Sequence, residues 1–237
     1  MKLLIGGNWK MNASVENIKL FEKFKDYGSD TIDIFIAVPF IFIEKCIKSF
    51  PKGISVAAQD ISTHEKGAYT GEISANYLKE YGVKYVIIGH SERRIHHFET
   101  NEEINEKLKI SLLNEIRPVL CIGESLEMRK SNRYMEFLLE EFKNSCKDLE
   151  GKSFDVAYEP VWAIGTGEKA NDSQIIEMIS QIKIWMKERR IIGRCLYGGS
   201  VSIENISELK KIECLDGFLI GNASLDESFI QMINELA

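Results

Sequence analysis

The sequence of 237 residues has no apolar run of the roughly 18 residues that a membrane-spanning helix needs. Its first ten residues include a short apolar run, but Asn8 and Lys10 interrupt it where a secretory signal would stay apolar. We therefore expect no membrane partner and no cleaved leader, and we expect the opening residues to form a strand.

The sequence also lacks an excess of basic residues. It contains 36 Asp and Glu against 30 Lys and Arg, which gives a net charge of −6. A surface that binds nucleic acid needs a basic patch, so we expect no nucleic-acid partner. An anionic ligand would have to be held by local charges and backbone dipoles instead.

Disulfide and metal motifs are missing as well. The cysteines are scattered and none lies in a CxxC pair: Cys46, Cys121, Cys146, Cys195 and Cys214. This pattern is typical of reduced thiols in the cytoplasm, and its apolar neighbours predict that Cys121 is a small core residue. His96 and His97 are adjacent and lack HxxxH spacing, so we expect no metal site.

Eight short apolar runs recur along the chain, and each is typical of a buried strand. They span residues 3–7, 32–38, 54–58, 85–89, 118–122, 154–158, 194–197 and 217–220. Stretches with helical spacing alternate with them, and no linker separates the units. This order predicts an α/β fold, a closed eight-stranded parallel (β/α)8 barrel with residues 1–237 as a single domain. In the fifth unit we expect one long charged helix over residues 125–149.

The stretch YEPVWAIGTG at residues 158–167 places Glu159 at the carboxyl end of a strand. Pro160 ends the strand, and Gly165 and Gly167 allow positive φ in the loop that follows. A carboxylate beside a glycine-rich loop indicates a base next to a lid that could exclude water. An ordinary strand-to-helix turn remains the alternative at this point.

Two further strand ends carry candidate groups. Asn8 and Lys10 point to the same side of the chain after the first strand, and Lys10 is a candidate anion holder. The alternative is an ordinary surface lysine. His90 follows the fourth strand at the start of a short helix, which makes it a candidate electrophile or acid. A structural histidine that caps the strand is equally open.

Two glycine-bearing turns and one long loop complete the candidate site. The turns, at residues 197–200 and 221–224, follow the seventh and eighth strands, where barrels of this kind usually bind phosphate through backbone N–H groups. Residues 59–71 form a loop too long for a plain connection. Ala68 and Tyr69 near its tip suggest that the tip packs into something.

Six motifs occur in order along the whole chain: NWKMN from Asn8, AYTGEIS from Ala68, GHSERR from Gly89, YEPVWAIGTG from Tyr158, YGGSV from Tyr197 and GNASL from Gly221. Together they resemble the triosephosphate isomerase family. Six separate motifs at matching strand ends are far more specific than any one of them. The resemblance implies a TIM barrel and a cofactor-free isomerase of glycolysis and gluconeogenesis. Its substrates would be dihydroxyacetone phosphate and D-glyceraldehyde 3-phosphate.

The resemblance also implies roles for single residues, in a family that is itself a standard example of pKa tuning. Glu159 matches the base that moves a proton between two carbons, and His90 matches the neutral electrophile. Lys10 matches the cation that stabilises the enediolate. Asn8 matches a substrate contact, and Glu92 matches the partner that positions Lys10.

Other implied roles concern the phosphate, the lid and assembly. Backbone N–H groups that bind the phosphate match Gly165, Ser200, Gly221 and Asn222. Trp162 and Tyr197 match residues that anchor the open and closed lid, with two aromatic core residues as the alternative. Thr70, in the long loop, matches a residue that reaches the Asn8 and Lys10 positions of a second subunit, which implies a homodimer.

Three departures from the family pattern stand out. Asn222 replaces the second glycine after the eighth strand, and we expect it to tolerate positive φ there. The lid hinge reads Glu168-Lys169-Ala170, and residues 95–98 lack the usual Phe-Gly, which should alter packing near the fourth helix.

Two other functions stay open: a non-catalytic barrel that acts as a binding or moonlighting protein, and an epimerase-like barrel with a different acid–base pair or a metal.

Overall fold

The computed structural model describes residues 1–22, 24, 30–164 and 169–237. Eight parallel strands close into a barrel in chain order, and β8 pairs with β1. The strands are β1 (Leu3–Asn8), β2 (Ile32–Val38), β3 (Ile54–Ala58), β4 (Tyr85–Ile88), β5 (Arg117–Ile122), β6 (Asp155–Tyr158), β7 (Cys195–Tyr197) and β8 (Gly217–Ile220). The predicted strands and the closed α/β barrel are therefore confirmed, with single-residue differences at some ends.

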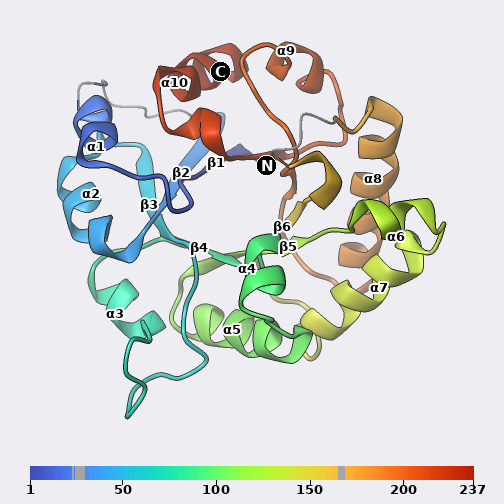
Figure 1. The fold of residues 1–237 in the computed structure, drawn as a ribbon, viewed down its shortest axis with the longest axis horizontal. Coiled ribbons are helices and arrows are strands. Elements are labelled where there is room, and N and C mark those ends of the chain that lie inside the picture. Colours follow the sequence, from blue (N-terminus) through green and yellow to red (C-terminus); the bar gives the residue numbers. More distant parts are fainter. Residues whose placement is uncertain (23, 25–29, 165–168) are drawn as a thin grey trace.

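Helices form a ring around the barrel, as Figure 1 shows in a view down the barrel. They are α1 (Val15–Phe21), α2 (Ile43–Ser49), α3 (Ala75–Glu80), α4 (Ser91–His96), α5 (Asn101–Leu113), α6 (Leu126–Lys130), α7 (Tyr134–Ser145), α8 (Asp172–Glu188), α9 (Ile206–Leu209) and α10 (Glu227–Leu236). Short 3₁₀ turns are η1 (Phe40–Phe42), η2 (Val161–Ala163) and η3 (Asn222–Ser224). No described helix is long and apolar enough to cross a membrane.

One predicted element was wrong. The fifth unit was expected to hold a single helix over residues 125–149, but it contains α6 and α7. Asn132 has a φ of 57°, which a continuing right-handed helix cannot contain. Ser131 closes the first piece, because its hydroxyl donates to Met128 O at 2.7 Å. The sequence on both sides of Asn132 has a charge pattern typical of a helix, so the break between α6 and α7 cannot be predicted from that pattern.

The core has two parts separated by the sheet. Inside the barrel, Leu4, Phe35 and Leu219 belong to a small cluster. Between the sheet and the helices lies a larger cluster, to which α8 contributes Ile175 and Ile179. Phe35 fits inside the barrel because Gly6 faces it, and a Cβ on Gly6 would lie 2.3 Å from the ring. All five cysteines are free thiols, and Cys121 is buried in the inner cluster.

A buried ion network lies where the strands begin. Asp155, fully buried at the start of β6, accepts from Arg117 Nε at 2.6 Å and from Arg194 Nη2 at 3.0 Å. Arg194 also donates to Asp33 Oδ2 at 2.7 Å, which joins β2 to this network. Burial alone would raise the pKa of Asp155, but the hydrogen bonds from the two arginines lower it below its ordinary value. The network therefore braces the end of the barrel opposite to the strands' carboxyl ends.

The turn between α4 and α5 contains the departure noted at residues 95–98. Phe98 has a φ of 57° and its side chain is 80% exposed. A bulky residue is rare in this left-handed region, because its Cβ crowds the following carbonyl. The ring gains little from packing in return. The altered packing expected from the sequence is thus accompanied by backbone strain.

We predict that Asp155→Asn lowers the free energy of unfolding by about 3–5 kcal/mol near neutral pH, because the buried Arg194 and the partly buried Arg117 lose the carboxylate that they share. The folded pKa of Asp155 is lowered, so its contribution is present above the unfolded pKa and is lost as pH falls. Urea unfolding of both proteins across pH tests this. The difference in the free energy of unfolding between wild type and variant should become smaller in acid. A difference that stays constant with pH contradicts the lowered pKa of Asp155.

We also predict that Phe98→Gly raises the free energy of unfolding by up to about 1 kcal/mol. Glycine relieves the left-handed strain, and this gain exceeds its larger entropy in the unfolded chain. Phe98→Ala is the matched control, since it removes the exposed ring but keeps a Cβ at positive φ. Denaturant titrations should place the glycine variant above both the wild type and the alanine variant.

Candidate active site

The carboxyl ends of the strands surround a cavity of about 250 Å³. Residues from five strand ends line it, and Asn8, Lys10, His90 and Glu159 come from three of these ends. The turns after β7 and β8 also line it, with Ser200, Gly221 and Asn222. The structure therefore brings together five parts of the chain that the sequence keeps apart, and the predicted acid–base residues share one cavity with Ser200, Gly221 and Asn222.

Lys10 sits in an unusual backbone conformation, with a φ of 49°. Its N–H donates to Asn8 Oδ1 at 3.0 Å, and its carbonyl accepts from Gln59 Nε2 at 2.9 Å. These bonds hold a conformation that costs a non-glycine residue on the order of 1–3 kcal/mol. The neighbouring Trp9 is fully buried and its indole donates to Ser224 O, so the segment is fixed to the turn after β8.

The Lys10 ammonium group is paired with Glu92, from the first turn of α4. Nζ lies 2.6 Å from Glu92 Oε1. Burial alone would raise the pKa of Glu92, but the hydrogen bond from Lys10 and the charge of Lys10 lower it. The pair orients the ammonium group toward the cavity while leaving Lys10 able to attract a second anion.

His90 precedes α4 and caps its first turn. Its Nδ1 accepts from the N–H of Glu92 at 3.2 Å. Because Nδ1 is an acceptor, the proton of the neutral ring lies on Nε2. That nitrogen is 3.1 Å from Glu159 Oε1. The capping role is thus present, and the cap selects the tautomer that can donate into the cavity.

Glu159 follows β6 and is 2% exposed. Its Oε2 accepts from the N–H of Ser91 at 3.0 Å, and its own N–H donates to Ile122 O at 2.8 Å. Cys121 also contacts it: burial and the Glu159 charge raise the pKa of the thiol, which hydrogen bonds to the carboxylate. Sequence reasoning missed Ser91 and Cys121, since a backbone donor and a small core residue carry no motif of their own.

The start of the lid segment is tied to the barrel through Glu124. Trp162 in η2 donates from Nε1 to Glu124 Oε1 at 3.1 Å, and Tyr158 OH donates to the same oxygen at 2.9 Å. Glu124 has no exposed surface, and burial raises its pKa. Nothing in the sequence marked Glu124. Gly165 and Glu168, both expected to belong to the lid, lie outside the described residues.

The turns after β7 and β8 differ in their local geometry. Burial raises the pKa of Tyr197 to about 12, and the backbone of Ser200 hydrogen bonds to its hydroxyl. A Cβ on Gly199 would lie 2.2 Å from that hydroxyl, so glycine is required there. Asn222 begins η3 and is not among the described residues with positive φ, so the expected tolerance of positive φ is not used.

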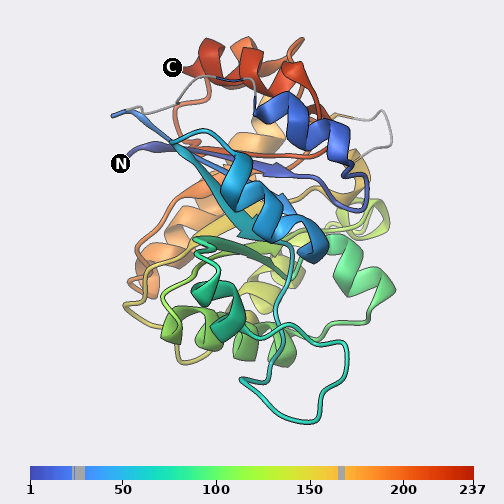
Figure 2. The same cartoon turned by 90° about the vertical axis from the view of Figure 1, so that its left-hand side faces the viewer.

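Thr70 is the expected site residue that lies away from this cavity. It is exposed, in the loop over residues 59–71, which projects from the barrel between β3 and α3 (Figure 2). Within the loop, the rings of His64 and Tyr69 stack with centroids 3.6 Å apart. The loop is therefore internally organised, but no contact among the described residues places Thr70 next to Lys10.

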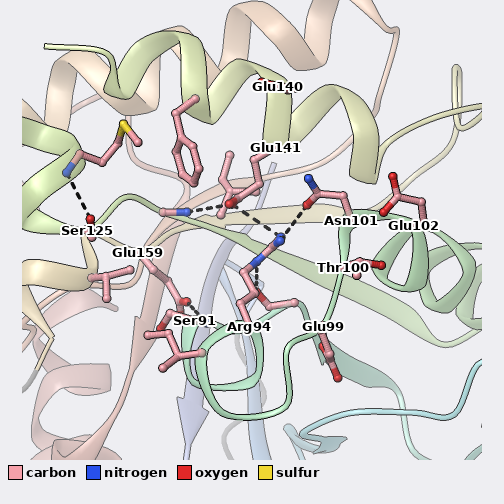
Figure 3. Close-up of a pocket in the computed structure, with 17 residues that line it drawn as sticks. Ser91, Arg94, Glu99, Thr100, Asn101, Glu102, Ser125, Glu140, Glu141 and Glu159 are labelled. Carbon is pink, nitrogen blue, oxygen red and sulfur yellow. Dashed lines mark hydrogen bonds and ion pairs between the residues drawn. The ribbon is translucent and has the colours of Figure 1, made fainter. Parts of the chain in front are cut away.

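A second cavity of about 550 Å³ lies behind Glu159, between α4, α5 and α7 (Figure 3). Arg94 and Glu141 point into it from opposite sides.

Among the described residues, no group of three or more His, Cys, Asp or Glu side chains could hold a metal ion. The first cavity, lined by Glu159, His90 and Lys10, combines one carboxylate, one imidazole, one ammonium group and backbone N–H groups. This set is suited to proton transfer next to an anion.

These features define an enzyme of the (β/α)8 barrel class, which places its chemistry at the carboxyl ends of the strands. A family model described as triosephosphate isomerase matches residues 3–236. The chain is 41% identical to the triosephosphate isomerase of Thermoanaerobacter pseudethanolicus over 98% of both chains. It is 38% identical to that of Alkaliphilus oremlandii, over 98% of this chain and 99% of the relative. It is 39% identical to that of Taenia solium, over 98% of both chains.

The chain belongs to the triosephosphate isomerase family, and it is an isomerase. The resemblance seen in the sequence is therefore confirmed. No finding favours the non-catalytic alternative.

Proposed function

We propose that Glu159, His90 and Lys10 carry out the interconversion of dihydroxyacetone phosphate and D-glyceraldehyde 3-phosphate. The supporting observation is the 3.1 Å contact between Glu159 Oε1 and His90 Nε2 in a cavity that Lys10 also lines. A substrate carbon and its carbonyl oxygen, placed there, would meet a base and a donor at once. Such placement accounts for much of the rate gain in proton-transfer enzymes.

In the proposed reaction Glu159 removes a proton from the carbon next to the carbonyl group. The electron pair forms the carbon–carbon double bond of an enediolate, and negative charge moves to the carbonyl oxygen. His90 meets this charge with its Nε2 proton and transfers protons between the two oxygens, while Lys10 stabilises the negative charge. Glu159 then returns its proton to the neighbouring carbon, so atoms and charge balance over the cycle.

The remaining proposed site residues hold the substrate. Ser200, Gly221 and Asn222 line the same cavity as the acid–base pair and would bind the phosphate, with Gly165 added from the lid. The phosphate would compete with Tyr197 for the backbone of Ser200. Asn8 would contact the substrate, and Trp162 would anchor the open lid through Glu124.

We further propose a two-fold homodimer. The exposed loop over residues 59–71 of one chain would enter a cavity of about 520 Å³ on the other, lined by Lys10, Met11 and Gln59. Met11 is 95% exposed in the single chain, which leaves an apolar side chain free to be covered. Thr70 would then brace the partner's site.

We also propose that the whole chain is a single domain that acts in the cytoplasm, without nucleic-acid or membrane partners.

We predict that Glu159→Gln lowers turnover by about a thousand-fold, within the range of general-base catalysis, with little change in substrate affinity. The amide cannot accept the proton from carbon, yet it keeps the shape of the side chain. A coupled assay with glyceraldehyde 3-phosphate measures turnover. Glu140→Gln, on the exposed part of α7, is the control and should retain full activity. Turnover above a tenth of the wild-type value would remove Glu159 from the mechanism.

We predict that replacing residues 68–70 with a short Gly-Ser turn gives a monomer with sharply reduced turnover. Interfaces of this kind bury more than about 1,000 Å², and the loop tip would supply a large share of that area. Sedimentation and activity are measured on the same sample. A fully active monomer, or a variant that stays dimeric at nanomolar concentration, contradicts the proposed assembly.

A further inference from the structure

Glu141 is a buried carboxyl group next to the active site with no part in the proposed reaction. It lies on the inward face of α7 and its side chain is 6% exposed. A carboxylate in such a place is costly unless other groups compensate it. Figure 3 shows it reaching from α7 toward the segment that follows β5 and toward Arg94 of α4.

Glu141 contacts two groups through one oxygen. Oε1 accepts from the N–H of Gly123 at 3.2 Å and lies 3.6 Å from Arg94 Nη2. Arg94 in turn donates to Gly89 O at 2.8 Å, to Cys121 O at 3.2 Å and to Asn101 Oδ1 at 2.8 Å. Arg94 therefore joins the ends of β4 and β5 to α5, and Glu141 completes the arrangement from α7.

These contacts lie directly behind the two groups proposed to move protons. Gly89 is the residue before His90. Gly123 packs so closely on the base segment that a Cβ there would lie 1.7 Å from Glu159 O. A small shift of either segment would change the 3.1 Å distance between His90 and Glu159.

We propose that Glu141 is a positioning residue whose ionised carboxylate, paired with Arg94, holds the His90 and Glu159 segments at their working distance. When the carboxyl is protonated, the pair loses its charge attraction and the two segments separate more freely. This inference rests on the proposed roles of His90 and Glu159. It adds a residue that touches no substrate.

The surroundings of Glu141 place its ionisation near neutral pH. Burial raises its pKa to about 7, and the negative charges of Glu159 and Glu124 act in the same direction. Arg94 and the N–H of Gly123 oppose them. Glu159 comes from the end of β6, Glu124 from the segment after β5, and Arg94 from α4. Glu99, Glu102 and Glu140 also line this cavity. Cys121 of β5 stays neutral because burial raises the pKa of its thiol.

Activity and stability should then change in opposite directions with pH. The folded pKa is raised above the unfolded one, so this group stabilises the fold in acid and that contribution is lost as pH rises through about 7. The ionised form, which holds the catalytic segments, is the less stable one. A purely structural role for Glu141 would not link turnover to its ionisation.

The test is the pH profile of kcat and KM for the wild type, Glu141→Gln and Glu140→Gln. Gln keeps an oxygen for the N–H of Gly123 but never ionises. At about one to two pH units above 7 we expect kcat of Glu141→Gln to fall by about tenfold, with KM changed less than about twofold. At about one to two pH units below 7, Glu141→Gln and the wild type should have nearly equal kcat. Glu140→Gln, which removes the same charge one residue away, should follow the wild type.

Two results would overturn the proposal. One is a loss of kcat in Glu141→Gln that is equal at every pH, and the other is a profile that matches the wild type. If the variant does not fold, the wild type alone decides the matter: kcat that stays flat through pH 7 contradicts the role of Glu141. Failure of the Glu159→Gln prediction would instead remove the proposed base, so the two ideas fail separately.

Discussion

Closure of the sheet between β8 and β1 is the constraint on which the rest of the molecule depends. The pairing of Leu4 with Gly217 through Gly7 with Ile220 leaves no free sheet edge. It also brings the carboxyl ends of all eight strands to one end of the barrel. A Cβ on Gly217 would lie 1.9 Å from Leu4 O, so the closing strand needs glycine at its first position.

The two ends of the barrel use buried charge in different ways. Where the strands begin, Asp155 is surrounded by two arginines, and its lowered pKa means that the ion pairs favour the folded state. Where the strands end, Glu124 and Glu141 have raised pKa values because burial outweighs their partners. The ionised form of Asp155 therefore favours the folded state. The ionised forms of Glu124 and Glu141, which lie where the chemistry is proposed, do not.

Backbone geometry follows the same division. Lys10 is held at positive φ by Asn8 and Gln59, next to the cavity, and the left-handed conformation aims its ammonium group at Glu92. Strain that persists beside a site is a common mark of function. Phe98 has a similar φ without comparable support, in an exposed turn. The same backbone feature is therefore held by hydrogen bonds beside the proposed site in one place and lies in an exposed turn in the other.

The sequence by itself determined the eight strands, the closed barrel and the family, because apolar periodicity and short motifs are local properties of the chain. Motifs also pointed to Glu159, His90 and Lys10 as candidate site residues, since each ends a strand or begins a turn. The break at Asn132 escaped prediction, because both flanking segments suit a helix. Ser91, Glu124, Arg94 and Glu141 acquire their positions only when distant segments pack together, and a carboxylate on a helix is normally expected at the surface. Their positions, the tautomer of His90 and the raised pKa values of Glu124 and Glu141 depend on neighbours from other strands and helices, so only the tertiary structure could decide them.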